Sequence, residues 1–106
     1  MKALDGIPKI EVEMAFLNQA EGGREQPPVL TTPSLYRPHL VVGDGEYLGV
    51  VFLSVPQSVQ AQSVFIATLG LAYHPNLDYS ALVPGAEFTV REGPRVVGRG
   101  RVLGNP

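Results

Sequence analysis

The residues best suited to chemistry in this chain are arginines, and half of its basic side chains lie in one short stretch near the end. Arg91, Arg95, Arg99 and Arg101 are four of the eight Lys and Arg residues. The planar guanidinium group matches the oxygens of carboxylates and phosphates. The stretch is therefore typical of a surface for RNA or for an acidic protein partner. It is more typical still of a solvated strand face whose charges keep sheets from associating.

The element that must position these arginines is a β-hairpin. Phe88 and Val90 alternate with Thr89 and Arg91, and Gly93-Pro94 then interrupts the pattern before a second extended stretch through Val102. Alternation of apolar and polar residues on both sides of a turn signal predicts two paired strands. One face of this hairpin is apolar, and the other is rich in arginine.

Two registers of this hairpin are possible. A loop of two residues would pair Val90 with Val97 and would bring Arg99 against the core. A loop of three residues pairs Val90 with Gly98, and we predict this register because it keeps the apolar face buried. Gly98 and Gly100 then point inward, where a missing side chain permits tight curvature. Four side chains point outward in this register: Arg91, Val97, Arg99 and Arg101.

The rest of the chain predicts further short strands. Apolar residues alternate with polar ones from Lys9 to Leu17, and two apolar segments, 39–42 and 47–53, flank a Gly-Asp-Gly turn. The segment 64–71 is almost continuously apolar, which predicts a strand buried on both faces. With 12 Gly and 10 Pro and no convincing helical period, the chain is expected to be all-β. About six strands must close into a barrel or stack as a sandwich.

Composition narrows the function classes. The 106 residues predict one domain spanning 1–106, and a net charge of −2 with a pI near 5.6 argues against a generally basic nucleic-acid protein. The absence of cysteine excludes disulfides, thiolate metal sites and a Cys nucleophile. His39 and His74 lie too far apart to suggest a metal site, so we expect no metal or cofactor. No segment is apolar enough for a signal peptide or membrane helix, so a cytoplasmic protein without a membrane partner is expected.

Three motifs, in order, carry a family resemblance: Gly22-Gly23-Arg24, Tyr36-Arg37-Pro38 and the hairpin segment Phe88–Gly100. From roughly Ile10 to Leu103, the chain resembles the third, C-terminal barrel domain of the bacterial elongation factor Tu family. It departs from the family between Leu53 and Val64, and Pro94 replaces a glycine of the family's last turn. No G-x-x-x-x-G-K-[ST] phosphate loop is present, so GTP binding and GTPase activity are not expected.

The resemblance implies a six-stranded antiparallel Greek-key β-barrel. In the full-length factors this barrel packs against the GTPase domain and touches the T-stem backbone of aminoacyl-tRNA. The corresponding contacts would fall near Arg24, Arg37, Arg91 and Arg95. Duplex RNA is recognised mainly through its shape, phosphates and 2′-hydroxyls, which arginine suits.

We therefore expect a non-catalytic binding module, first of all a protein-interaction barrel related to translation factors. The alternatives are a weak binder of tRNA or structured RNA and, third, a small-molecule enzyme, although no catalytic set of residues is recognisable. Tyr47, Tyr73 and Tyr79 are candidate aromatic anchors. Arg24 and Arg37 could instead hold loop carbonyls or acidic residues. The candidate contact residues are Arg24, Arg37, Arg91, Arg95, Arg99 and Arg101.

Overall fold

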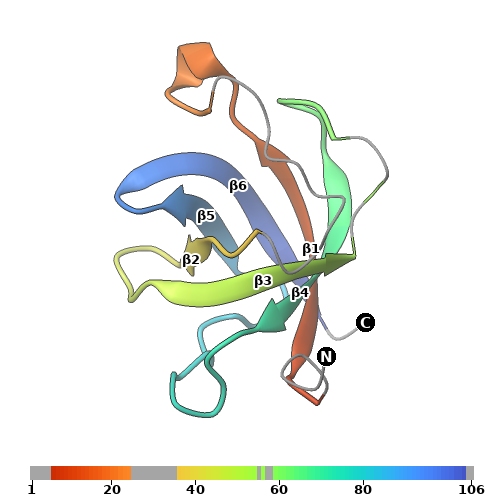
Figure 1. The fold of residues 1–106 in the computed structure, drawn as a ribbon, viewed down its shortest axis with the longest axis vertical. Helices are drawn as coiled ribbons and strands as arrows, with labels where there is room; N and C mark the ends of the chain where they lie inside the picture. Colours follow the sequence, from red (N-terminus) through yellow and green to blue (C-terminus); the bar gives the residue numbers. More distant parts are fainter. Residues whose placement is uncertain (1–5, 25–35, 55, 57–58, 105–106) are drawn as a thin grey trace.

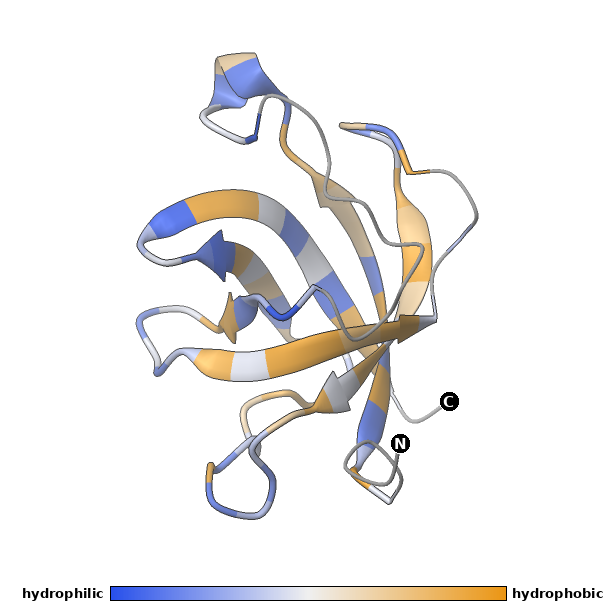
Figure 2. Ribbon diagram, in the orientation of Figure 1, coloured by the Kyte–Doolittle hydropathy of each residue, from blue (hydrophilic) through white to orange (hydrophobic). Residues whose placement is uncertain are grey.

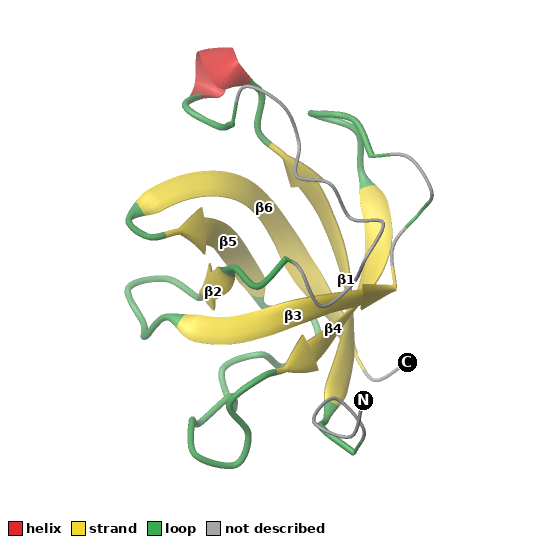
Figure 3. Ribbon diagram, in the orientation of Figure 1, coloured by secondary structure: helices red, strands yellow, loops and turns green. Residues whose placement is uncertain are grey.

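Six strands of this chain form a closed, antiparallel β-barrel (Figure 1). The computed structural model describes residues 6–24, 36–54, 56 and 59–104. Apart from the strands, this part of the chain contains a single 3-10 turn at Gln19–Glu21 (Figure 3). The strands are β1 (Lys9–Phe16), β2 (His39–Val41), β3 (Leu48–Ser54), β4 (Phe65–Leu71), β5 (Glu87–Glu92) and β6 (Arg95–Gly104).

The order of the strands around the barrel is β1-β4-β3-β2-β5-β6, and β6 returns to pair with β1. Strands β2, β3 and β4 are consecutive in sequence and each pairs with the next, and β1 pairs with the other side of β4. Three consecutive strands with a fourth returning beside them make a Greek key. Closure pairs every strand on both sides, which removes the exposed edges that would otherwise promote aggregation.

The core of the barrel is built by alternation along the strands. In β1, Ile10, Val12, Met14 and Phe16 are buried, and Glu11 and Glu13 between them are half-buried. Hydrophobic residues predominate along the strands of the barrel (Figure 2). Period two is the natural repeat of a strand with one buried face. The largest buried side chains meet in an aromatic cluster. It comprises Phe16, Tyr36, Phe52 and Phe65, whose ring centroids lie 5.1 to 6.4 Å apart.

The prediction that segment 64–71 is buried on both faces is wrong for the first part of the segment and holds for its last residues, 69–71. Val64 is 68% exposed and Ile66 is 53% exposed, whereas Phe65, Ala67 and Leu69 face the core. At the other end of β4, Gly70 is buried, and its outer side lies against Ile7, Val51 and Leu53. The continuous apolar run therefore marks burial on both faces at the end of β4 and an exposed apolar patch at its start.

The terminal hairpin keeps the predicted pairing but reaches it by a different turn. Val90 lies opposite Gly98 as expected, yet Glu92 pairs with Arg95, so the loop is only Gly93-Pro94. A β-bulge at Val97 supplies the extra residue that the predicted three-residue loop was meant to provide.

The bulge also corrects the predicted orientation of Val97. This side chain is fully buried rather than outward, because the bulged strand turns both Val97 and Gly98 toward the interior. Gly100 points inward as predicted. A Cβ there would collide with the Glu13 carbonyl group and the ring of Phe88, so the backbone packs directly against both.

Candidate functional site

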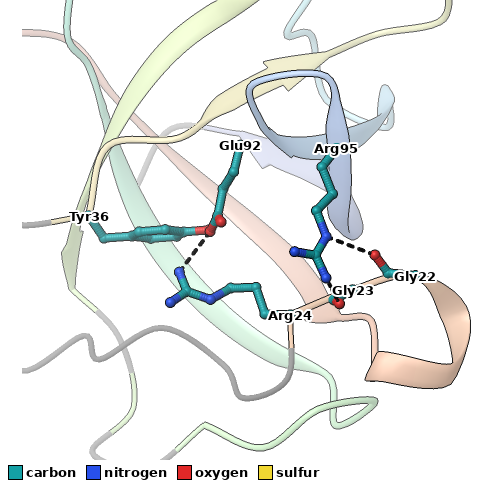
Figure 4. Close-up of polar contacts among 6 residues, drawn as sticks. All are labelled: Gly22, Gly23, Arg24, Tyr36, Glu92 and Arg95. Carbon is teal, nitrogen blue, oxygen red and sulfur yellow. Dashed lines mark hydrogen bonds and ion pairs between the residues drawn. The ribbon is translucent and has the colours of Figure 1, made fainter.

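The loop after β1 is fastened to the turn of the terminal hairpin by a shared carboxylate. Arg24 Nη1 lies 2.9 Å from Glu92 Oε2, and the Tyr36 hydroxyl donates to the same oxygen over 2.8 Å (Figure 4). Tyr36 is buried, and its burial, together with the Glu92 carboxylate, raises the pKa of its hydroxyl well above the ordinary value. The hydroxyl therefore stays a donor to Glu92.

Arg95 completes this contact from the other side of the turn. Its Nε donates to the Gly22 carbonyl over 3.0 Å, and its Nη2 donates to the Gly23 carbonyl (Figure 4). The two carbonyls are presented by a loop of defined shape. Asn18 and Glu21 form a capping box around the 3-10 turn, and Gly22 ends it with φ +93°, a conformation that favours glycine.

These contacts join the motifs that were far apart in the sequence. We call them the loop–hairpin contact, which comprises Gly22, Gly23, Arg24, Tyr36, Glu92 and Arg95. Two of the candidate arginines, Arg24 and Arg95, thus hold the fold together. Sequence reasoning foresaw that Arg24 could bind an acidic residue but missed Glu92 as that residue. The only signal was its place beside Gly93-Pro94, within the hairpin motif itself.

Arg91, Arg99 and Arg101 do not join this contact. Arg101 Nε lies 3.1 Å from Glu13 Oε1 across the β1–β6 pair. Arg91 Nε donates to Thr89 Oγ1 over 3.0 Å. Arg37 is exposed just before β2. Arg99 is exposed in the middle of β6, and it forms no hydrogen bond or ion pair within the described ranges. The six candidates therefore do not form one site.

A second feature is an aromatic surface formed by β2, β5, the residue before β3 and the loop after β4. We define the aromatic surface as His39, Tyr47, Tyr73 and Arg91. The Arg91 guanidinium lies 5.7 Å from the Tyr47 ring centroid, and the His39 ring lies 5.6 Å from it. His39 pairs with Arg91 on one side and with Gly49 on the other. The Tyr73 ring lies directly over Gly49, where any larger side chain would displace it.

The three tyrosines of this region differ in exposure: Tyr47 and Tyr73 are exposed, and Tyr79 is buried. Tyr79 is buried, and its hydroxyl donates to the Gly49 carbonyl over 2.6 Å while accepting from the Tyr73 N–H over 3.0 Å. Burial raises the pKa of Tyr79, which keeps this donor protonated. Tyr47 is 40% exposed and Tyr73 is 55% exposed. Of the three predicted anchors, two therefore present their rings to solvent and the third positions one of them.

A third feature is a shallow hollow on the outer face of β1 and β6, close to Arg99. It encloses about 300 Å³, and the apolar side chains of Ala15 and Val64 form part of its wall. A second hollow of about 300 Å³ lies on the β5 side of Arg99 and includes Val41 and Thr89. The charged residues lining the first hollow are Glu13, Glu87, Arg99 and Arg101.

The comparisons with known proteins add no family. The chain matches no known protein-family model, and no curated protein is significantly similar to it. In the described ranges, no group of three or more His, Cys, Asp or Glu side chains could hold a metal ion. The same ranges contain no helix of the length and hydropathy needed to cross a membrane.

Proposed function

We propose that this protein is a non-catalytic interaction barrel that binds a protein partner of the cytoplasmic translation apparatus through its aromatic surface. One observation carries the proposal. Tyr47 and Tyr73 are both exposed, the Arg91 guanidinium group lies over the Tyr47 ring, and the Tyr73 ring covers Gly49 of β3. The link to translation rests on the three motifs that resemble the elongation-factor barrel.

The chemistry of the surface favours a protein ligand. Tyrosine and arginine are enriched among the residues that dominate binding free energy at protein interfaces. Tyrosine supplies a large apolar area with few rotatable bonds, so little conformational entropy is lost on binding. The hydrogen bonds from Tyr79 restrain the loop of Tyr73 before any partner arrives. This preorganisation lowers the cost of association.

RNA is the competing ligand that the arginines suggested. Binding of RNA depends on arginines that can neutralise phosphates. Here Arg24 and Arg101 are ion-paired with glutamates, and Arg95 donates to two backbone carbonyls. These engagements, with a net charge of −2, favour protein over RNA as the ligand.

The test retrieves partners with the tagged full chain from an extract of its own cells, treated with ribonuclease and compared by quantitative mass spectrometry. The wild type is expected to retain a defined protein that a Tyr47→Ser, Tyr73→Ser double variant loses. The matched control is Val83→Ser, because Val83 is 54% exposed and lies outside the aromatic surface. All variants are first shown to have the wild-type unfolding midpoint.

Two results would contradict the proposal. One is a retrieved protein whose yield is the same for the wild type and the double tyrosine variant. The other is the appearance of tRNA as the main retrieved molecule in untreated extract, with binding that falls steeply as salt rises. That outcome would favour the RNA alternative instead.

A further inference from the structure

Arg99 differs from its neighbour Arg101 in what lies opposite each of them. In the register of the barrel, Arg101 lies between Glu13 on β1 and Glu87 on β5. It also makes an ion pair with Glu13. Arg99 lies between Ala15 and Thr89, neither of which carries charge. The positive charge of Arg99 is therefore uncompensated across the strands, whereas that of Arg101 is balanced on both sides.

The surroundings of Arg99 are apolar on the β1 side. Ala15 and the 68% exposed Val64 line the same hollow as Arg99, and Ile66 lies opposite Glu13 on the outer face of β4. Exposed β-branched residues around a shallow depression leave apolar area in water that a partner could cover. The hollow thus combines one uncompensated guanidinium group with an aliphatic wall. We call it the Arg99 hollow.

We infer that the Arg99 hollow binds an extended segment of a partner protein that carries an aliphatic side chain beside an aspartate or glutamate. The carboxylate pairs with Arg99, and the aliphatic side chain covers Ala15 and Val64. Charge complementarity selects the acid, because Arg99 is the cation of the hollow that lacks a carboxylate opposite it. This inference concerns β1, β4 and β6 and does not depend on the aromatic surface.

The same hollow disfavours nucleic acid. Two carboxylates, those of Glu13 and Glu87, line it together with the two arginines, and in the register both lie opposite Arg101 rather than Arg99. A phosphate backbone approaching Arg99 would pass close to both carboxylates, and like charges at short range are repelled. A single carboxylate on a peptide can avoid them because its neighbours along the peptide are uncharged. The closed barrel also pairs both sides of β1 and β6, so the ligand is read by side chains rather than by strand addition.

The test selects random peptides displayed on phage against the immobilised full chain, in parallel with an Arg99→Glu variant. Peptides enriched on the wild type are expected to carry Asp or Glu next to Val, Ile or Leu. Peptides enriched on Arg99→Glu are expected to carry Lys or Arg in place of the acid. The most enriched wild-type peptide is then synthesised and titrated in solution, together with its Asp→Asn or Glu→Gln version.

Solution binding supplies the matched controls. Arg99→Gln and the amide version of the peptide are each expected to weaken binding at least about tenfold, since a charge-assisted contact is lost. Lys9→Gln, which removes one exposed cation from the far end of β1, is expected to change the affinity less than about twofold. Backbone amide resonances of Ala15, Val64 and Arg99 are expected to shift on titration.

Several outcomes would overturn the inference. They are the absence of any enriched peptide, enrichment without an acidic residue, and equal affinity for the wild type and Arg99→Gln. Peptide-induced shifts at Tyr47 and Tyr73 without shifts at Arg99 would also overturn it and would assign the peptides to the aromatic surface. Stronger binding of an RNA hairpin than of the peptide at the same resonances would replace the protein segment with RNA.

Discussion

Arg95 and Arg99 lie on the same strand, yet Arg95 forms hydrogen bonds that stabilise the fold, whereas the Arg99 side chain is exposed to solvent. Arg95 starts β6 and reaches two carbonyls of the loop after β1. Arg99 lies in the middle of the strand between an alanine and a threonine. The residue type is the same, and the neighbours brought in from distant parts of the chain differ. The role of an arginine here is decided by what the topology places opposite it.

The loop–hairpin contact and the Arg99 hollow therefore respond differently to substitution. The first joins segments that are 56 to 73 positions apart, and most of its hydrogen bonds are partly buried. Removing one of its members leaves donors or acceptors without a partner. The second contains a charge that is already solvated. Substitution there is expected to alter binding while leaving the stability of the barrel almost unchanged.

The largest difference is expected for Glu92→Ala. It leaves the buried Tyr36 hydroxyl and the Arg24 guanidinium group without their shared acceptor. We expect the free energy of unfolding to fall by about 2 kcal/mol, a value reduced for the partial exposure of the pair. Arg99→Ala is the matched control and is expected to change it by less than about 0.5 kcal/mol. Urea unfolding measures both, and equal losses would contradict the contrast.

Tyr36→Phe sharpens the same contrast by removing only a hydroxyl group. The ring stays in the aromatic cluster with Phe16 and Phe52, so the lost interaction is the hydrogen bond to the Glu92 carboxylate. We expect a loss of about 1.5 kcal/mol in the free energy of unfolding, because the acceptor is charged. Combining Tyr36→Phe with Glu92→Ala should cost less than the sum of the two single losses. Strict additivity would show that the two residues do not act together.

Alkaline pH is expected to lower the free energy of unfolding by weakening the loop–hairpin contact. The folded-state pKa of Tyr36 is raised by burial and by Glu92, so the folded protein holds this proton when the unfolded chain releases it near pH 10. The stabilisation is complete below about pH 10 and falls as the pH rises further, by at most about 1.4 kcal/mol per pH unit for this group. Urea midpoints between about pH 9 and about pH 11.5 should fall less steeply for Tyr36→Phe. Tyr79, whose pKa is raised by burial, contributes a slope in the same direction in both proteins.

Local patterns were sufficient to predict most strands of this barrel. The alternation in β1 and the turn signals around β2 and β3 lie within single segments, and the structure confirms them. The outer exposure of Val64 and Ile66 could not be predicted, because an apolar run does not reveal whether anything covers its second face. The bulge at Val97 could not be predicted from the sequence either. A bulge and a longer loop add the same one residue to the register, so the pairing alone could not distinguish them.

The sites depended still more on long-range pairing. Arg24 and Glu92 are 68 positions apart, and no local spacing links them. Whether Arg91 stacks on Tyr47, and whether Arg101 meets Glu13, follows from the order of strands around the barrel. The sequence therefore predicted a group of arginines, and only the topology separated Arg24 and Arg95, which stabilise the fold, from Arg99, which pairs with no described side chain.

The smallest expected effect concerns Arg101 and Glu13. They line the Arg99 hollow but are ion-paired, as Arg24 and Glu92 are in the loop–hairpin contact. The ion pair of Arg101 and Glu13 is mostly exposed, with side-chain exposures of 57% and 37%. Exposed pairs of this kind contribute little because water and salt screen them. A double-mutant cycle with Arg101→Ala and Glu13→Ala should give a coupling free energy of about 0.3 kcal/mol. The same cycle for Arg24 and Glu92 should give about 1 kcal/mol, because that pair shares its acceptor with a buried hydroxyl. Equal coupling in the two cycles would show that the loop–hairpin contact gains nothing from Tyr36. The distinction between fastening and open arginines would then rest on Arg95 alone.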